Sequence, residues 1–275
     1  MEKYTKLKKY PLFMKILFSL TFLLLLLSCR DESSISVEKD KSLKNDSKNR
    51  KLIVVAHSDS KQNPIIFKDG SGISSEIIDE LNKVQTKYRF VHKMVPNKRM
   101  KILVPSGEVN IVAFSNLSFG WDKNEMLQST ELIQDKDVYF TLKEGGKDQS
   151  FFEDFSSLKV VGVKGFHYNF DKSKTSFIEV QNEKAVLEMI LLKRGDIGVV
   201  SILGLNHLSL KEPETFTKLF LADKYDQEYK RYYLLKKDGP ISINEVNSYI
   251  KTLRSQGTLE KIYKKYGLRD SVLTD

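Results

Sequence analysis

Seven residues in this sequence are suited to holding a small molecule without bonding to it covalently. They are Ser58, Arg99, Ser118, Trp121, Gly165, His167 and Ser201. The serines fall at predicted strand ends and can donate hydrogen bonds, whereas the tryptophan ring offers a flat wall or a cation–π face for a ring, a sugar face or a quaternary amine. The arginine fork and the backbone amides at 165–167, where a strand turns into a predicted helix, can receive an anion. Each feature also has an ordinary explanation: a tryptophan packed under a loop, a surface arginine, a solvated histidine.

Patterns for catalysis or metal binding are scarce. Acid–base catalysis needs a positioned pair of groups, and only His167 with a carboxylate that the sequence does not identify offers one. No Gly-x-Ser-x-Gly nucleophile motif occurs. His57, His92 and His207 have no spacing typical of a metal site. We expect no enzyme activity, no metal and no cofactor.

Short apolar strands alternate with amphipathic helices, which favours an α/β fold with mainly parallel sheets flanked by helices. Predicted strands cover residues 52–56, 88–92, 110–114, 137–142, 159–163, 177–180 and 197–200. Predicted helices open at Gly72 and near Gly165, and cover residues 98–104 and 182–194. The two halves share this pattern of elements but no detectable sequence repeat.

The C-terminal stretch predicts two helices. Ser242 and Glu245 have the spacing of a capping box, in which each residue bonds the backbone amide of the other. An apolar stripe follows, and Gly257 can end the helix in a left-handed cap. Residues 258–266 predict a second, shorter amphipathic helix.

The N-terminal segment is typical of an export signal. Five lysines precede an apolar run at 16–27, and the only cysteine, Cys29, follows Ser28. Residues 26–29 resemble the lipobox of bacterial lipoproteins, in which the small residue before the cysteine permits cleavage and the thiol carries a diacylglycerol. The resemblance implies that Cys29 begins a lipid-anchored mature chain. The alternative is an uncleaved anchor, and both place the globular part outside the cytoplasm.

The rest of the chain is expected to be one soluble monomeric body. Residues 30–50 are polar and predict a flexible tether. Removing residues 1–28 takes away five lysines and Glu2, which lowers the net charge from +9 to about +5. The remaining charges are mixed without a basic block, so we expect no nucleic-acid partner.

Several motifs together resemble the amino-acid-type (family 3) bacterial extracellular solute-binding proteins. The C-terminal stretch LRSQGTLEKIYKKYG at 253–267 looks like that family's terminal helix pair. NPIIF at 63–67 with Gly70 and Gly72, SGEVNI at 106–111, and the stretches at 158–165 and 193–197 match other places in the same order. The resemblance covers residues 51–268.

The resemblance implies a two-lobed type II periplasmic-binding-protein fold, in which two crossovers form a hinge and a ligand is enclosed at the seam. The implied divisions are a signal peptide at 1–28, a tether at 29–50, lobe one at 51–137 and 237–275, lobe two at 144–229, and hinge strands at 138–143 and 230–236.

This sequence departs from the family at the two charged ligand anchors. The arginine that grips a carboxylate falls on Trp121, with the preceding threonine position at Ser118, and the aspartate that takes the ammonium falls on Ser201. A buried charge without its partner costs several kcal/mol. A conventionally held α-amino acid is therefore not expected.

The resulting expectation is an extracytoplasmic lipoprotein that closes two lobes on a small solute and serves an ABC-type permease or a membrane sensor. One alternative is a degenerate binding-fold lipoprotein that acts through protein contacts or signalling. The other is a dehydratase-like enzyme with its site in the cleft. A hollow cleft, rather than one filled by Phe119 and Trp121, would favour solute capture.

Overall fold

The computed structural model describes residues 50–58 and 63–268. The chain divides into two units, residues 1–50 and 51–275. The predicted signal peptide, Cys29 and the tether up to residue 49 lie outside the described residues. Within the described part, no helix is long and apolar enough to cross a bilayer.

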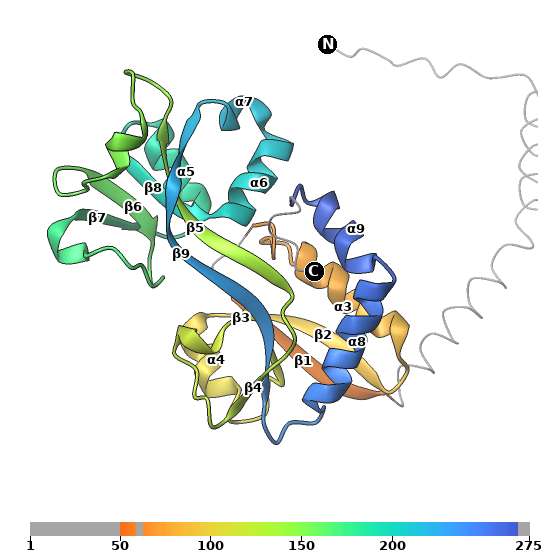
Figure 1. Ribbon diagram of the computed structural model, residues 1–275. Helices are drawn as coiled ribbons and strands as arrows, with labels where there is room; N and C mark the ends of the chain where they lie inside the picture. The colour runs from red at the N-terminus through yellow and green to blue at the C-terminus, as the bar shows by residue number, and fades with distance from the viewer. Residues whose placement is uncertain (1–49, 59–62, 269–275) are drawn as a thin grey trace, which may run out of the picture. The chain divides into compact units, whose positions relative to one another are not determined.

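The described chain is an α/β structure with the predicted alternation of elements (Figure 1). Its strands are β1 (Lys51–Ser58), β2 (Tyr88–Val95), β3 (Ile111–Ser115), β4 (Met126–Gln128), β5 (Ile133–Leu142), β6 (Lys159–Val163), β7 (Ser176–Val180), β8 (Ile197–Ser201) and β9 (Leu219–Lys236). Its α-helices are α3 (Ile73–Val84), α4 (Asn97–Leu103), α5 (Glu183–Leu191), α6 (Ile202–Lys211), α7 (Pro213–Phe216), α8 (Ile243–Ser255) and α9 (Thr258–Lys265).

Hydrogen bonds connect these strands in the order β2-β1-β3-β9-β5-β8-β6-β7, and β4 also pairs with β9. Strands β1, β2 and β3 are parallel, as are β6, β7 and β8. The long strands β5 and β9 run antiparallel between these two parallel groups (Figure 1). The carboxyl ends of both parallel groups are therefore connected through one pair of strands.

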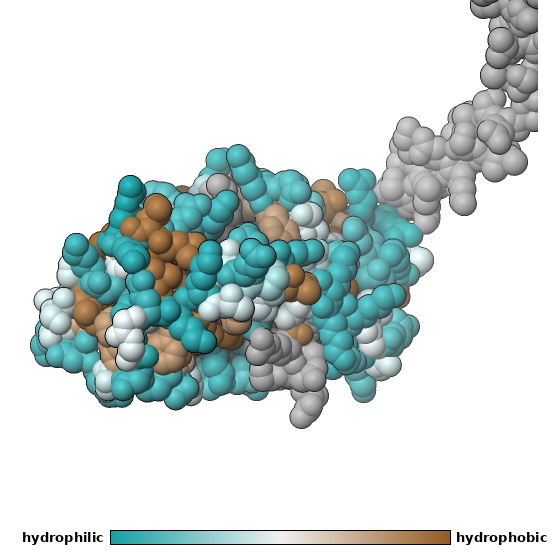
Figure 2. Space-filling model, turned by 90° about the horizontal axis from the view of Figure 1, so that it is seen from above, coloured by the Kyte–Doolittle hydropathy of each residue, from teal (hydrophilic) through white to brown (hydrophobic). Residues whose placement is uncertain are grey.

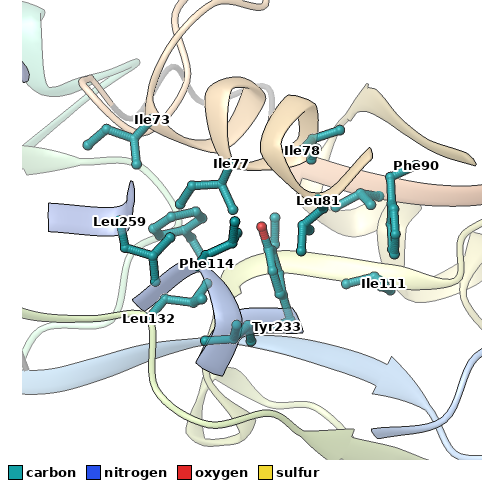
Figure 3. Close-up of a cluster of buried hydrophobic side chains, with 14 of the residues drawn as sticks. Ile73, Ile77, Ile78, Leu81, Phe90, Ile111, Phe114, Leu132, Tyr233 and Leu259 are labelled. Atoms are coloured by element: carbon teal, nitrogen blue, oxygen red, sulfur yellow. The ribbon is translucent and has the colours of Figure 1, made fainter. Parts of the chain in front are cut away.

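The first parallel group is buried on both faces. Helices α3, α8 and α9 cover one face, and Figure 3 shows side chains of α3, including Ile77 and Leu81, gathered near Tyr233 of β9. Each fully buried side chain of this size contributes roughly 1.5–3 kcal/mol. On the other face, α4 packs Met100 and Leu103 against Val112 of β3. This second face also carries Trp121, which makes it the face that matters for the site.

Helix α3 begins where the sequence predicts because only glycine fits before it. Gly72 has φ 132°, and a Cβ atom there would lie 2.7 Å from the carbonyl oxygen of Ile65. The backbone amides of Ile73 and Ser74 donate to the carbonyls of Pro64 and Ile65. The first turn of α3 is thereby closed by the loop at 63–67, and its amides are not left for an anion.

The second parallel group differs from the prediction after β6. Helices α5 and α6 pack on one of its faces, but the segment after β6 is a loop with a short 3-10 turn rather than an α-helix. The carboxylate of Asp226 accepts hydrogen bonds from the backbone amides of Asn169 and Phe170, which an α-helix would use internally. The phenol oxygen of Tyr168 accepts from the amide of Val163. The prediction of a helix near Gly165 is therefore wrong, because the Asp226 carboxylate and the Tyr168 hydroxyl hold this loop in a non-helical conformation.

The remaining predicted elements are present with shifted ends. Strand β5 starts four residues before the predicted 137, and α5 ends three residues before the predicted 194. The sequence interpretation named no helix at α6 or α7. The face of residues 51–268 seen in Figure 2 is mostly hydrophilic, with smaller hydrophobic patches between the polar side chains.

Candidate functional site

A cavity of ≈ 510 Å³ lies where the two parallel groups meet the long strands β5 and β9. Its wall contains residues from α4, from the end of β3 and the loop after it, from β5 and β9, and from the loop after β6. Its volume falls in the range of small-molecule sites in proteins. The cavity is hollow, because Phe119 and Trp121 form part of its wall and do not fill it.

Five of the seven predicted ligand-binding residues line this cavity. They are Ser58, Ser118, Trp121, Gly165 and His167. Ser58 ends β1 and Ser118 lies in the 3-10 turn after β3, so two of the three serines predicted at strand ends lie in this wall. That they line one cavity is a structural finding, whereas their contact with a ligand stays a prediction.

The indole of Trp121 is fixed in the cavity wall. Its Nε1–H donates to the hydroxyl of Ser115 at 2.9 Å, and the half-buried ring packs against the core beneath α4. The ammonium of Lys101 lies 5.8 Å from the ring centroid and donates to the carbonyl of Gly120 at 2.8 Å. The tryptophan is thus both a packed residue and a wall residue.

The loop after β6 contributes a left-handed turn and no helix terminus. Gly165 has φ 80°, and His167 is exposed with its backbone carbonyl accepting from the Gln227 amide at 2.8 Å. The predicted capture of an anion by a helix start at these residues therefore has no structural basis. The loop instead presents Phe166 and His167 to the cavity.

Arg99 and Ser201 do not line the cavity. Arg99 is exposed on α4. Ser201 is buried at the end of β8, where its hydroxyl donates to Asp135 at 2.7 Å and accepts from the amide of Leu203 at 3.1 Å. Both hydrogen-bonding roles of the Ser201 hydroxyl are therefore used inside the protein.

We call the group formed by Arg231, Asp135, Asp137 and Glu183 the floor of the cavity. Its buried ion pair was not predicted from the sequence. The Nε of Arg231 donates to Asp135 Oδ2 at 2.7 Å, and its Nη2 lies 2.6 Å from the same oxygen. Its Nη1 donates to the carbonyl of Phe114, a residue with φ 51°, and its Nη2 donates to the Tyr229 hydroxyl. The side chains of Arg231 and Asp135 are 3% and 0% exposed, so this pair is held away from solvent.

Asp137 stands beside this pair and lines the cavity. Its oxygens accept from the side-chain amide of Gln227 at 2.7 Å and from the Tyr229 hydroxyl at 3.0 Å. Burial, followed by the charge of Asp135, raises the pKa of Asp137 to about 7. This carboxyl is therefore poised to change its charge when its surroundings change.

Glu183, at the start of α5, is the third acid of the floor. Its Oε1 accepts from the backbone amide of Ser201 at 3.1 Å, and its Oε2 is buried without a hydrogen-bond partner in the described part of the chain. Burial, followed by the charge of Asp135, raises the pKa of Glu183 to about 8. Three carboxyl groups thus interact electrostatically with one guanidinium group, and one of them, Asp135, forms an ion pair with it.

A period-two signal in the sequence points to these residues. Asp135 and Asp137 alternate along β5, and Gln227, Tyr229 and Arg231 alternate along β9, so each set lies on one face of its strand. The predicted ligand-binding residues lay mainly at strand ends and in the loops after strands. The polar faces of the long strands were therefore overlooked.

The other histidines lie away from the cavity wall. His57 is buried, and burial followed by the charge of His92 lowers the pKa of His57 to about 3. The ring of His207 contacts Phe67, and its Nδ1 bonds the carbonyl of Tyr266. No group of three or more metal-binding side chains occurs among the residues that the structure describes.

No protein-family model matches the chain, and no curated protein matches it in sequence. Solved structures do match. The GluR0 ligand-binding core from Nostoc punctiforme, in complex with L-glutamate, has 14% identity and a TM-score of 0.63 over 78% of this chain and 98% of that one. The substrate-binding protein of an amino acid ABC transporter has 14% identity and a TM-score of 0.61 over 78% and 98%.

A third match is the ancestral amino acid-binding protein AncCDT-1, a precursor of cyclohexadienyl dehydratase, with 17% identity and a TM-score of 0.63 over 83% of this chain and 98% of that one. At such identities the likeness concerns the fold. Together with the strand order described above, it shows that residues 51–268 have the type II periplasmic-binding-protein fold that the resemblance to family 3 solute-binding proteins implied.

Proposed function

We propose that this protein captures a small solute in the ≈ 510 Å³ cavity by closing two lobes around it. The observation that carries the proposal is the cavity itself, which is hollow and combines aromatic walls with the polar side chains of Asp137 and Arg231. Concave sites with apolar walls and a few converging polar groups are the usual form of small-molecule sites. The solute-binding proteins with this fold support the same role.

The proposed motion is a bend of the two long strands. Lobe one comprises residues 51–137 and 237–275, lobe two comprises 144–229, and the crossovers at 138–143 and 230–236 act as the hinge. The pairing of β5 with β9 shifts register between Asp137 and Val138 and again before Phe140, beside the proposed hinge. Such bulges bend a strand and weaken its ladder locally, which supports bending there. Contacts from both lobes would then shift the equilibrium toward the closed form.

The sequence supports an extracytoplasmic, lipid-anchored location for this activity. In the proposal, Cys29 carries the anchor and the closed form is read by an ABC-type permease or a membrane sensor. The solute is not held in the manner of a conventional α-amino acid, because Trp121 and Ser201 occupy the two anchor positions. Arg231 is already paired with Asp135 and so does not replace the missing carboxylate anchor.

The hollow cavity also bears on the competing functions. A protein that acts only through protein contacts does not require an open site with converging polar groups. A dehydratase-like enzyme has a specific observation in its favour, because Asp137 has a pKa near 7 and lines the cavity with His167. In the described part of the chain no hydrogen bond joins these two side chains directly, so we place binding first and catalysis second.

A thermal-melt screen of the full-length protein tests the proposal. The panel contains amino acids, polyamines, sugars, nucleosides, organic acids and quaternary amines. A solute at a hundred times its dissociation constant adds about 2.7 kcal/mol to stability, which raises the melting temperature measurably. Ser58→Phe, which adds a ring at the cavity wall, should weaken or abolish the shift. Ser255→Phe, at an exposed position on α8, should retain it. A shift that is undiminished in Ser58→Phe, or no shift with any solute class, would contradict capture in this cavity.

A further inference from the structure

The cavity floor has more acidic groups than basic ones. Among the described residues Arg231 is the only guanidinium group at the floor, and it is bound to Asp135 through two short contacts. Asp135 also accepts from the hydroxyl of Ser201. With this pair internally neutral, Asp137 and Glu183 make no ion pair of their own in the described part of the chain, although each feels the more distant charge of Arg231. The floor therefore has a surplus of two carboxyl groups.

Of these two carboxyl groups, Asp137 is the one that lines the cavity. Its two bonds come from neutral donors, the amide of Gln227 and the hydroxyl of Tyr229. A buried carboxylate needs a compensating positive charge, and without one it takes up a proton. The raised pKa of Asp137 agrees with that balance. A positive charge on a bound solute would stabilise the ionised carboxylate of Asp137 and so favour loss of its proton.

Aromatic rings in the same wall also favour a cation. Phe119, Trp121, Phe166 and Tyr229 line the cavity, and the rings of Phe119 and Tyr229 meet edge to face at 5.4 Å. The negative face of an aromatic ring attracts a cation within about 6 Å of its centroid. The floor offers no comparable site for an anion, because the Arg231 guanidinium group there is already paired with Asp135.

The charged and titratable groups around Asp137 come from several elements. They are Asp135 on β5, Tyr229 and Arg231 on β9, Glu183 on α5, Tyr139, Tyr168 and Asp226 nearby, and His167, Lys98 and Lys101 in the outer wall. The two lysines are exposed on α4, and Lys101 donates to a backbone carbonyl. They are thus part of the outer wall, whereas the acidic surplus is at the floor.

We propose that the solute carries a protonated amine or guanidinium group that docks against the Asp137 carboxylate, and that its binding releases the proton of this carboxyl group to solvent. The inference rests on the proposed capture of a solute in this cavity. No bond forms or breaks other than the O–H bond of Asp137, and the solute keeps its own protons and charge.

Three probes of one chain length test the class of solute. They are cadaverine, pentane-1,5-diol and glutarate, which carry positive, neutral and negative ends on five carbons. Calorimetry with the full-length protein at pH 7, in two buffers of different ionisation enthalpy, should show saturable binding of cadaverine alone. The heat should depend on the buffer, because a proton is released.

Asp137→Asn tests the residue. The variant keeps the shape of the side chain and removes its charge, so cadaverine should bind about 10- to 100-fold more weakly, the range expected for a lost hydrogen bond to a charged group. The dependence of the heat on the buffer should decrease. Asp223→Asn makes the same chemical change at an exposed position of β9 and should leave both readouts unchanged.

The outcomes separate this inference from the proposed function. Binding of the diol or glutarate without binding of cadaverine would overturn the cationic solute and leave solute capture intact. Cadaverine that binds Asp137→Asn as tightly as the unsubstituted protein, or that binds the unsubstituted protein without proton release, would overturn the role of Asp137. No binding of cadaverine would also overturn the inference, whereas failure of the wider melt screen would overturn solute capture itself.

Discussion

The buried acids beneath the cavity connect its chemistry to the stability of the protein. A carboxyl group whose pKa is higher in the folded chain than in the unfolded chain binds its proton more tightly after folding. Its stabilising effect is complete below the unfolded pKa and is lost as the pH rises through the folded pKa. For Glu183 this window extends from its ordinary 4.5 to about 8. Asp137 has the same sign, from 3.8 to about 7.

Glu183→Gln should remove part of this pH dependence. The neutral amide cannot ionise, so the stability of the variant should fall less than that of the unsubstituted protein between pH 5 and pH 8. The difference between the two changes should be at least about 1.4 kcal/mol, which corresponds to one pKa unit. Urea unfolding at several pH values measures it.

Glu188→Gln provides the matched control, because Glu188 is exposed on the same helix. Its stability should follow the unsubstituted protein at every pH. If Glu183→Gln and the unsubstituted protein gave parallel stability curves, the Glu183 carboxyl group would not be protonated by burial in the folded chain.

Some individual residues of the site were predicted from the sequence. Ser58 and Ser118 were predicted from their places at strand ends, which meet at one edge of a parallel sheet, and Trp121 from the resemblance, which places it at the carboxylate-binding position; all three line the cavity. Arg231 and Asp135 were not found, because their partnership joins two strands that are 96 positions apart in the chain. Pairing between distant strands depends on register, and a single sequence carries little information about register.

Individual elements were predicted best where local chemistry determines them. Helix α8 has the predicted capping box: the amide of Glu245 donates to the Ser242 hydroxyl, and the amide of Ser242 donates to the Glu245 carboxylate. The same carboxylate also bonds the ammonium of Lys87, which is the main cause of the lowered pKa of Glu245, about 2. The loop after β6 was predicted wrongly, because its course depends on Asp226, more than fifty positions away.

Ser242→Ala should destabilise the protein by about 1 kcal/mol, because the first turn of α8 loses its side-chain acceptor. Urea unfolding measures the loss. Ser248→Ala in the same helix removes a hydroxyl that bonds only the carbonyl of Glu245 within the helix, so it should change stability by less than about 0.5 kcal/mol. Equal effects of the two substitutions would show that the capping box does not stabilise α8.

For residues 51–268 as a whole, the alternation of strands and helices predicted the fold class correctly. Each parallel group needs helices on its faces, and the hydrophobic pattern of those helices is local. The lengths of β5 and β9 were underestimated, because their polar faces interrupt the apolar pattern where they pass beneath the cavity. The polar residues that interrupt the apolar pattern of β5 and β9 include the residues of these strands that line the cavity.

Capture of a solute in the cavity between the two groups of strands can be observed directly. Trp121 is the only tryptophan in the chain and lies in the cavity wall, so its fluorescence reports on this place alone. We would titrate the full-length protein with a solute that raises its melting temperature and record the tryptophan emission. We expect a saturable change in intensity or wavelength with the same dissociation constant as calorimetry gives, and none in Ser58→Phe. Binding by calorimetry with unchanged Trp121 emission would rule out capture in this cavity, because the solute would then be bound somewhere else.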